Sequence, residues 1–329
     1  MEQRELGRSG VRISRVVLGC GNFGGIGSAP ELFGRGESDA EASAIMDAAW
    51  EAGITTFDTA DAYGGGRSET AIGRWLETKG PEVRDRIVLS TKTFNPMDAG
   101  EDHGLAPARI RRQIDASLTR LGVERVDLYL AHDWDPDVPV AETLGAFDQL
   151  VEAGKVRAAG ASNVSAAQLE DALAAAEEHG VRRYEWVQNE YSLLAREAEL
   201  DVLPLCEREA LGFTPFSPLA GGWLTGKYRR GEPAPPGSRM TQRPEPYLHL
   251  QRDEIFDALD SLAEAAVEHG TDTATLALAW LLARPGVDAV IVGPRRPEHL
   301  VPALRALELD LSPSELHALA DPFAWASAS

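Results

Sequence analysis

The sequence is poor in cysteine and in positive charge. Of its 329 residues two are cysteine, and 32 lysines and arginines stand against 52 aspartates and glutamates, which gives a formal net charge of −20. Cys20 and Cys206 cannot form a disulfide framework and have no metal-ligand spacing, so we expect a reducing compartment. Negative charge opposes binding to nucleic-acid phosphates and to anionic lipid headgroups. The composition therefore argues against a nucleic-acid-binding or membrane-surface protein.

Long apolar runs are also missing. The longest, around residues 274–283, is far shorter than the roughly 20 residues that span a bilayer. The first residues, MEQRELGRSG, contain no apolar stretch of the kind found in signal peptides. Together with the scarcity of cysteine, these absences predict a cytoplasmic protein.

Short β-branched or apolar segments alternate with longer segments of helical period along almost the whole chain. This alternation is typical of parallel strands joined by crossover helices, and eight units without a break in composition favour a (β/α)8 TIM barrel. We expect residues 1–329 to form a single barrel domain, with an N-terminal β-hairpin cap over residues 5–13 and long loops on the C-terminal face. The predicted strands are residues 16–21, 55–58, 87–91, 126–131, 158–162, 186–190, 212–216 and 289–292.

Several helix starts and one long loop can be located from local patterns. A serine followed three residues later by glutamate or glutamine is a capping box, and an apolar residue at every third or fourth position marks a helix face. Residues 217–251, rich in Gly, Pro and Arg, form the one long irregular segment, and a loop of that length in a compact domain is usually functional. The capping boxes begin at Ser38, Ser165 and Ser312, and the apolar face comprises Ile110, Ile114, Leu118 and Leu121.

Residues 19–24, Gly-Cys-Gly-Asn-Phe-Gly, match the dinucleotide-binding pattern GxGxxG after a predicted strand. That pattern requires a helix to begin at once, so that its N-terminus faces the pyrophosphate. Here loop residues continue through Pro30, and the next helix is predicted only from Asp39. We therefore interpret this segment as an active-site loop and not as part of a Rossmann fold.

Side chains capable of proton transfer stand at the ends of three successive strands. Asp58 and Tyr63 end or follow the second strand, Lys92 ends the third, and His132 follows the fourth. In a barrel these points converge on one face. Lys92 is one of only four lysines and lies in an apolar strand, where burying its amine requires a counter-charge; Asp58 is the available partner.

At this point the chain resembles the aldo-keto reductases. The resemblance lies in the runs FDTADAYGGG, STK, YLAH, GASN, QNEYS and FSPLAGGWLTGKY, which occur in family order within about residues 6–307. It implies a (β/α)8 barrel that binds a nicotinamide cofactor without a Rossmann domain. It also implies a catalytic tetrad, which falls on Asp58, Tyr63, Lys92 and His132.

These residue types suit the reduction of an aldehyde or ketone. Hydride delivered to a carbonyl carbon leaves negative charge on the oxygen, and a nearby acid must supply a proton. Tyr63 is the expected acid, and Lys92, held by Asp58, is expected to lower the pKa of that phenol. His132 is expected to bind the carbonyl oxygen and fix its position.

The remaining strand ends and loops provide the predicted cofactor contacts. Neutral amides and a hydroxyl suit a carboxamide, a flat ring suits the nicotinamide, and a glycine-rich turn with a lysine suits a pyrophosphate. Arginines at a helix start after the eighth strand suit the extra phosphate of NADPH, which we expect in preference to NADH. The predicted contacts are Gly21, Asn22, Ser162, Asn163, Gln188, Phe216, Ser217, Leu219, Gly221, Lys227, Arg239, Gly293, Arg295 and His299.

In the family, the helix after this last motif commonly carries Gln or Arg and then Glu-Asn towards the adenine end. This chain has His299, Pro302 and Ala303 at the matching positions. We therefore extend the predicted cofactor contacts no further than His299.

Phe23, Trp134 and Trp223 are predicted to line the substrate pocket, because they are aromatic residues on or beside the loops that set specificity on this scaffold. The substrate would be a small-molecule carbonyl compound. Its identity and the oligomeric state stay open.

Two other functions are considered. A nucleotide-sensing regulatory subunit is one, because some relatives of this family accompany membrane channels. The other is a metal-dependent hydrolase, with His132, Asp133 and Asp135 as ligands. We prefer no metal, and expect Asp133 and Asp135 to be solvated loop charges.

Overall fold

The computed structural model describes residues 1–100 and 102–327, and its centre is a parallel sheet of eight strands. The strands are hydrogen-bonded in the order β10-β3-β4-β5-β6-β7-β8-β9. The edge segments also meet, since Asp288 N donates to Phe213 O and Ile291 N donates to Pro215 O, both at 3.0 Å. The sheet is therefore the predicted barrel. Its strands are β3 (Val16–Gly19), β4 (Thr56–Asp58), β5 (Val88–Thr93), β6 (Val126–Ala131), β7 (Val156–Ser162), β8 (Trp186–Gln188), β9 (Gly212–Phe213) and β10 (Val290–Val292).

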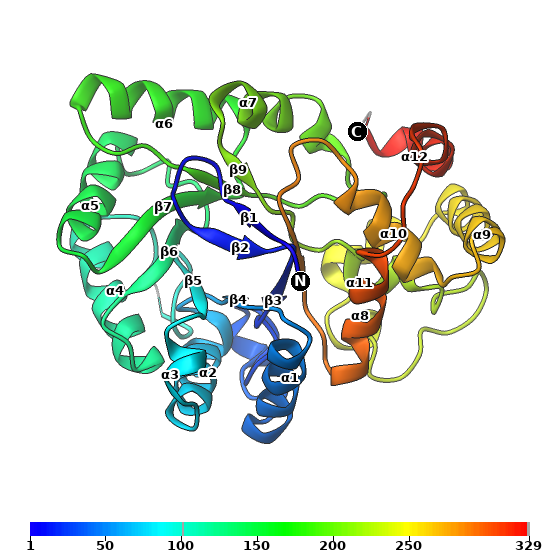
Figure 1. The fold of residues 1–329 in the computed structure, drawn as a ribbon, viewed down its shortest axis with the longest axis horizontal. Coiled ribbons are helices and arrows are strands. Elements are labelled where there is room, and N and C mark those ends of the chain that lie inside the picture. The colour runs from blue at the N-terminus through cyan, green and yellow to red at the C-terminus, as the bar shows by residue number, and fades with distance from the viewer. Residues whose placement is uncertain (101, 328–329) are drawn as a thin grey trace.

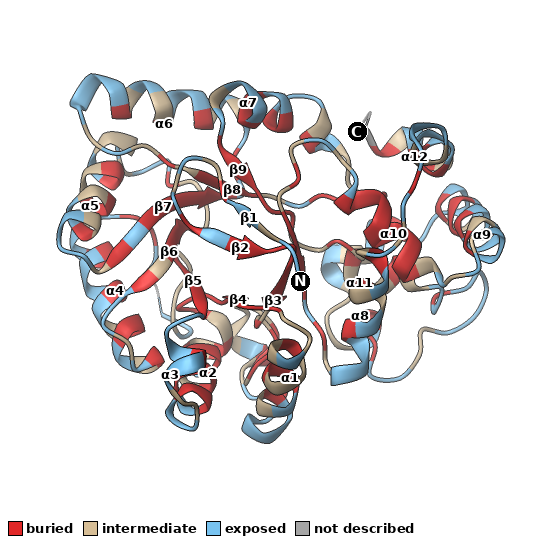
Figure 2. Ribbon diagram, in the orientation of Figure 1, coloured by how far each residue is buried: buried red, intermediate tan, exposed pale blue. Residues whose placement is uncertain are grey.

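Helices surround this sheet on the outside (Figure 1). Figure 2 shows that the strands of this sheet are mostly buried, whereas many helices are buried only on the side that faces them. The helices are α1 (Asp39–Glu51), α2 (Arg67–Glu77), α3 (Pro81–Arg84), α4 (Pro107–Leu121), α5 (Val140–Glu152), α6 (Ala166–His179), α7 (Val202–Glu209), α8 (Arg239–Gln242), α9 (Asp253–Glu268), α10 (Thr273–Leu282), α11 (Val301–Ala306) and α12 (Pro313–Ala320).

The local patterns explain where several of these helices begin. Each predicted capping box is formed, with the serine hydroxyl accepting from the third helical N–H and the glutamate or glutamine accepting from the serine N–H. The apolar stripe of α4 is buried against the sheet, as its spacing predicts. Local sequence therefore sets these boundaries, and burial of the apolar faces stabilises the helices on the barrel.

A two-stranded hairpin, β1 (Gln3–Glu5) and β2 (Arg12–Ser14), crosses one end of the barrel (Figure 1). Leu6, Val11 and Ile13 from this hairpin are buried in one apolar cluster with Val17 and Leu128 of the barrel strands. The hairpin thus closes the end of the barrel opposite to the C-terminal ends of the strands, as predicted.

Long connections leave the C-terminal ends of the strands. The β3–α1 loop runs from Cys20 to Ser38, which agrees with an active-site loop and not with a Rossmann helix. Residues 217–251 contain short helical segments at Ala220–Thr225, Arg239–Gln242 and Glu245–Leu250.

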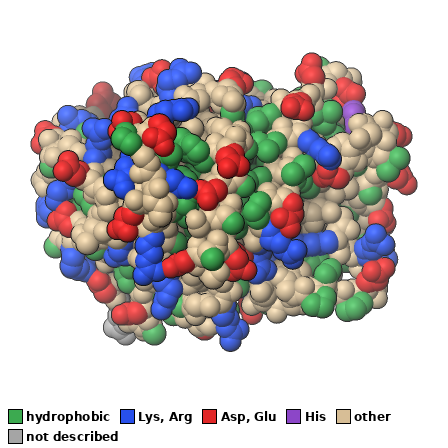
Figure 3. Space-filling view, turned by 60° about the horizontal axis from the view of Figure 1, so that its bottom comes forward, with side chains coloured by type: hydrophobic (Ala, Val, Ile, Leu, Met, Phe, Trp, Pro, Cys, Tyr) green, Lys and Arg blue, Asp and Glu red, His purple; other side chains and the backbone are tan. Residues whose placement is uncertain are grey.

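Basic and acidic side chains are interspersed over the face shown in Figure 3. Among the described residues, no helix combines the length and apolar character needed to cross a membrane.

Candidate active site

Lys92 and Asp58 form a buried ion pair at the C-terminal ends of neighbouring strands. Asp58 pairs in register with Ser90, and Lys92 lies two residues beyond Ser90, so their side chains share one face of the sheet. Lys92 Nζ donates to Asp58 Oδ2 at 2.5 Å and to Thr59 O at 2.9 Å, and the paired side chains are 0% and 4% exposed. Burial alone would lower the pKa of Lys92, but Asp58 and Tyr63 outweigh it and raise the pKa. The amine therefore stays charged.

The second carboxylate oxygen of Asp58 also has partners. Ser90 Oγ donates to Asp58 Oδ1 at 2.7 Å, and Gln188 Nε2 donates to the same oxygen at 3.2 Å. Gln188 was predicted to contact a carboxamide, but in this structure its amide nitrogen is used to hold Asp58. The carboxylate is thus fixed from three sides and can orient Lys92.

Tyr63 lies on a tight turn, Tyr63–Gly65, that follows β4. Its hydroxyl is 3.4 Å from His132 Nε2, and Lys92 Nζ is 5.1 Å from the centre of its ring. A Cβ on Gly21 would lie 3.5 Å from the same ring, so Gly21 borders the phenol. Tyr63 and His132 are half-buried whereas Lys92 and Asp58 are buried, so the part of the cluster that solvent can reach belongs to Tyr63 and His132.

The pKa of Tyr63 is raised, whereas the sequence led us to expect that Lys92 would lower it. Burial raises the pKa of this phenol and is the largest influence, while Lys92 lowers it and Asp58 raises it. Lys92 acts in the expected direction, but burial outweighs it and the pKa is raised. Tyr63 therefore carries its proton at neutral pH.

His132 follows β6 and is neutral in this environment. Burial lowers the pKa of His132 well below its ordinary value, and the charge of Lys92 lowers it further. Asn95 Nδ2 lies 3.2 Å from the second ring nitrogen, Nδ1. Arg109 Nη2 in turn donates to the carbonyl oxygen of Asn95 at 2.7 Å, which holds the loop after β5 in place.

The predicted contacts after β7 lie close to this cluster. Ser162 Oγ donates to Gln188 O at 2.7 Å, and Asn163 Nδ2 donates to His132 O at 2.8 Å. Asn163 has a positive φ of 55°, a conformation that asparagine tolerates better than most residues. The ends of β6, β7 and β8 are thereby joined beside His132.

Phe216 lies three residues beyond β9, and its ring packs against the apolar cluster inside the barrel. A left-handed turn follows, because φ is 53° at Ser217, 45° at Ala220, 62° at Gly221 and 95° at Gly222. Within it, Ala220 N donates to Ser217 O and Gly222 N donates to Leu219 O, both at 2.8 Å. Leu219 is thus part of the turn predicted to approach a pyrophosphate.

The two glycines of this turn make room for side chains from the long loop. A Cβ on Gly221 would lie 2.5 Å from the Tyr247 ring, and a Cβ on Gly222 would lie 2.2 Å from Lys227 Nζ. Both glycines also have a positive φ, a backbone conformation that residues with a side chain rarely adopt, so glycine is favoured at both positions. The Lys227 amine is therefore held directly against the turn, where the sequence predicted a cation.

Lys227, Arg239 and Arg295 gather positive charge at this edge of the barrel. Burial lowers the pKa of Lys227, and the charges of Arg239 and Arg295 lower it further. Burial likewise lowers the pKa of Arg239, to which Arg295 contributes. Arg239 Nη2 also donates to Asn22 Oδ1 at 2.9 Å. An anion bound between Lys227 and Arg239 would offset the repulsion among these charges, which fits the pyrophosphate of a dinucleotide.

The segment after β10 completes the set of predicted cofactor contacts. A Cβ on Gly293 would lie 3.9 Å from Asn22 Nδ2, so this strand end borders the β3–α1 loop. Arg295 N donates to His299 Nδ1 at 3.3 Å. The Arg295 guanidinium is engaged by protein groups, because its Nε donates to Glu37 Oε1 at 2.7 Å.

Two of the three predicted pocket residues lie in the core. Phe23 is 0% exposed and Trp223 is 1% exposed. The Trp223 ring packs against Tyr228 and Phe256, with ring centres 4.9 and 5.6 Å apart. These rings fill the space beneath the loops that carry them and present no surface to a substrate.

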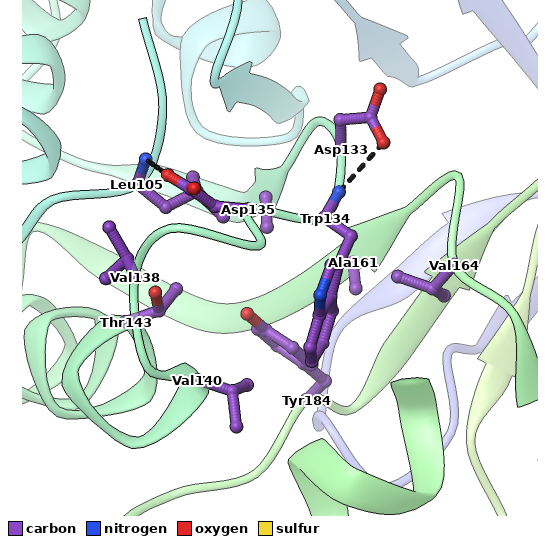
Figure 4. A pocket seen from close by; sticks show the side chains of 11 residues that line it. Leu105, Asp133, Trp134, Asp135, Val138, Val140, Thr143, Ala161, Val164 and Tyr184 are labelled. Carbon is purple, nitrogen blue, oxygen red and sulfur yellow. Dashed lines mark hydrogen bonds between the residues drawn. The ribbon is translucent and has the colours of Figure 1, made fainter. Parts of the chain in front are cut away.

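Trp134 is half-buried, and its side chain does not lie where a substrate pocket was predicted. It lines a small cavity with Val140, Ala161 and Tyr184, and its ring points towards Tyr184 (Figure 4). This cavity lies where α5 begins, on the helix-covered side of the sheet. The side chain that would form a pocket wall beside His132 is therefore not that of Trp134.

The loop acids after His132 have structural partners. Asp135 Oδ2 accepts from Leu105 N at 2.6 Å and its Oδ1 accepts from Asp137 N at 2.9 Å. Asp135 is 9% exposed, so the expectation of a solvated charge is wrong for this residue. Across the described part of the chain, no three His, Cys, Asp or Glu side chains are grouped so that they could hold a metal ion.

Three side chains of the site were not expected from the sequence: Asn95, Glu37 and Tyr247. Asn95 lies two residues beyond β5, and this polar residue at a strand end was the one available indication. Glu37 directly precedes Ser38, the N-cap of α1, and no sequence pattern assigned it a role. Tyr247 comes from the long loop, whose path the sequence did not predict.

Comparisons with known proteins agree with this geometry. The model of the aldo/keto reductase family matches residues 15–321. The oxidoreductase YrpG of Bacillus subtilis, named as uncharacterized, is 36% identical over 332 residues, covering 98% of this chain and 96% of the relative. A putative voltage-gated potassium channel subunit beta of Schizosaccharomyces pombe is 36% identical over 321 residues, covering 93% and 88%. The versiconal hemiacetal acetate reductase of Aspergillus parasiticus is 30% identical over 348 residues, covering 98% and 97%.

In (β/α)8 barrel enzymes the active site lies at the C-terminal ends of the strands, and the ionisable cluster of this protein lies at that place. The chain belongs to the aldo/keto reductase family, whose members generally use NAD(P)H.

Proposed function

We propose that this protein reduces an aldehyde or ketone to an alcohol with NADPH, and that Tyr63 donates the proton. One observation carries the proposal: the Tyr63 hydroxyl lies 3.4 Å from His132 Nε2, beside a buried Lys92–Asp58 pair. The acid, a neutral hydrogen-bond donor and a fixed positive charge meet at one opening. A carbonyl oxygen placed there would be bound and protonated at the same point.

The residues around this opening fit a nicotinamide dinucleotide, whose bound form supplies the hydride. Ser162, Asn163 and the amide oxygen of Gln188 would contact its carboxamide, and Phe216 would lie against the nicotinamide ring. The turn around Ser217, Leu219 and Gly221 would contact the pyrophosphate, together with Lys227 and Arg239. Gly21, Asn22 and Gly293 would border the cofactor between its nicotinamide and adenosine ends. Arg295 and His299 would face the adenosine ribose and its phosphate.

Each member of the tetrad has a distinct proposed task. His132 donates a hydrogen bond to the carbonyl oxygen and so fixes the substrate. Tyr63 transfers its hydroxyl proton to that oxygen as negative charge develops there. Lys92 stabilises the resulting phenolate, because opposite charges favour the ionised form. Asp58 holds the amine of Lys92 in place. The substrate is thus a small carbonyl compound. The scarcity of cysteine supports a reducing, cytoplasmic setting.

The test is a turnover assay on the purified protein. It is mixed with NADPH or NADH and with a panel of aromatic and aliphatic aldehydes and ketones, and loss of the reduced-nicotinamide absorbance is followed. Turnover of at least one carbonyl, with the matching alcohol as product, is expected. Binding of the cofactor without turnover of any carbonyl would contradict the proposal.

A regulatory subunit that senses the nicotinamide nucleotide is the second candidate. The observation that favours it is the 36% identity to a putative voltage-gated potassium channel subunit beta. A sensor needs cofactor binding and little chemistry, whereas this chain retains Asp58, Tyr63, Lys92 and His132 together. Oxidation of bound NADPH by an aldehyde in a single turnover distinguishes the two, because a sensor would release its cofactor still reduced.

A further inference from the structure

Glu37 is a buried carboxylate at the edge of the proposed cofactor site, and the residue is 5% exposed. Its Oε1 accepts from Arg295 Nε at 2.7 Å. Its Oε2 is fully buried and accepts no hydrogen bond from the residues that the structure describes. Burial raises the pKa of Glu37, although the Arg295 guanidinium opposes this shift. Burying a carboxylate oxygen without a hydrogen bond lowers the stability of the fold, and groups of this kind often have a functional role.

Glu37 is held rigidly where it is. Its backbone N–H donates to Asn22 O at 2.8 Å, and its carbonyl oxygen accepts from Gly24 N at 2.9 Å. The next residue, Ser38, caps α1 through a complete capping box. Glu37 cannot swing away from Arg295 by a backbone movement without breaking these contacts, so the ion pair is a fixed part of the site.

The Arg295 guanidinium is shared among several acceptors. Besides Glu37, its Nη1 donates to Gly237 O at 2.7 Å and to Gln242 Oε1 at 2.9 Å. Arg295 thus joins the β3–α1 loop to the long loop after β9. Any phosphate that binds Arg295 must compete with the Glu37 carboxylate, which is already hydrogen-bonded to the guanidinium.

This competition distinguishes two dinucleotides that are otherwise alike. NADPH carries a phosphate on the adenosine ribose, and NADH carries a hydroxyl at the same place. A phosphate at Arg295 would stand near the fixed negative charge of Glu37, and like charges repel strongly where solvent is scarce. A hydroxyl incurs no such repulsion and can donate to a carboxylate. In other dinucleotide sites an acidic residue accepts this hydrogen bond from the ribose.

We propose that Glu37 is a specificity-determining residue that limits the preference of this site for NADPH over NADH. It does so by neutralising Arg295, the side chain available to a ribose phosphate. This inference rests on the proposed function, because it requires a nicotinamide dinucleotide at this edge of the barrel. Lys227 and Arg239, which have no carboxylate bonded to them in the described structure, would still bind the pyrophosphate common to both cofactors.

The test compares the affinities of NADPH and NADH for the full-length protein and for Glu37→Gln, measured by quenching of intrinsic tryptophan fluorescence. Glu37→Gln should tighten NADPH binding about tenfold, or about 1.4 kcal/mol, and change NADH binding less than about twofold. Glu31→Gln is the matched control, since it removes an exposed carboxylate from the same loop and should leave both affinities unchanged. Glu37→Ala serves as a second variant if the amide disturbs folding.

A double-mutant comparison locates the effect. In the Arg295→Ala background, Glu37→Gln should no longer change the ratio of the two affinities, because the guanidinium for which phosphate and carboxylate compete is gone. Equal tightening of both cofactors, or an unchanged ratio in Glu37→Gln and Glu37→Ala, would overturn the role of Glu37 while leaving the proposed function intact. Failure of both dinucleotides to bind any variant would overturn the proposed function and this inference together.

Discussion

Asn95 Nδ2 lies 3.2 Å from His132 Nδ1, and this contact favours one tautomer of the neutral ring. An amide nitrogen can only donate, so Nδ1 is the acceptor and the hydrogen of the neutral ring is on Nε2. Nε2 is the nitrogen that faces the Tyr63 hydroxyl at 3.4 Å. The imidazole is therefore arranged to donate towards the opening of the site, where the carbonyl oxygen is proposed to bind.

Replacing Asn95 by alanine should lower kcat/KM about fivefold, because a lost neutral hydrogen bond of about 1 kcal/mol would allow the other tautomer and other ring orientations. Affinity for the cofactor should be unchanged, as measured by fluorescence titration. Asn95 is a positioning residue, so its effect should vanish in the His132→Ala background. An equal loss in both backgrounds would mean that Asn95 acts only through the loop.

Tyr63→Phe keeps the ring and removes only the hydroxyl. General acids contribute about 10²- to 10⁴-fold to a rate, so kcat for carbonyl reduction should fall by that factor in steady-state assays. Cofactor affinity should remain within about twofold, since the ring still fills the space beside Gly21. Near-normal turnover by this variant would remove Tyr63 from its proposed role.

The sequence was sufficient to predict the barrel and the cluster of Asp58, Tyr63, Lys92 and His132. Alternation of strand and helix patterns sets the order of elements, and a parallel barrel necessarily brings the ends of neighbouring strands to one face. Little knowledge of side-chain direction was needed, because Lys92 and Asp58 lie at the ends of neighbouring strands and the buried amine requires a counter-charge.

The loops were harder to predict for a physical reason. Residue type suggested that Phe23 and Trp223 line a pocket, but the position of a loop side chain depends on long-range packing, and both rings fill the core. The pairing of Glu37 with Arg295 joins residues 258 positions apart through two loops. No local pattern encodes such a contact.

The buried pair of Lys92 and Asp58 makes a separate prediction about stability. Lys92→Met leaves the Asp58 carboxylate buried without its cation, and breaking such pairs costs about 3 to 5 kcal/mol. The double variant Asp58→Asn with Lys92→Met should recover much of that loss, because no uncompensated charge remains. Urea unfolding of the wild type, Lys92→Met and the double variant measures the loss of stability and its recovery. Turnover should be lost in both variants, which separates the stability of the pair from its role beside Tyr63.

Asp61, two residues before Tyr63, is completely buried, and in the described structure neither of its carboxylate oxygens accepts a hydrogen bond. Burial raises the pKa of Asp61 from 3.8 to about 7, and the Glu69 charge adds to this, while Thr93, Arg109 and Arg120 oppose it. Tyr129, which also faces this group, has its own pKa raised chiefly by burial. Asp61 N donates to Lys92 O at 3.0 Å, so this acid belongs to the turn that carries Tyr63.

Because the folded protein binds the Asp61 proton more tightly than the unfolded chain does, this group stabilises the fold fully below about pH 4, and its contribution is lost as the pH rises through about 7. Within that range the free energy of unfolding should fall by up to about 1.4 kcal/mol per pH unit through Asp61 alone. Asp61→Asn removes this titration. Urea unfolding at several pH values should therefore show the variant gaining stability relative to the wild type as the pH rises from 5 to 8, in contrast to Asp310→Asn, which changes an exposed carboxylate. Parallel stability curves for Asp61→Asn and the wild type would mean that Asp61 is ionised in the folded protein, with a partner that offsets its burial.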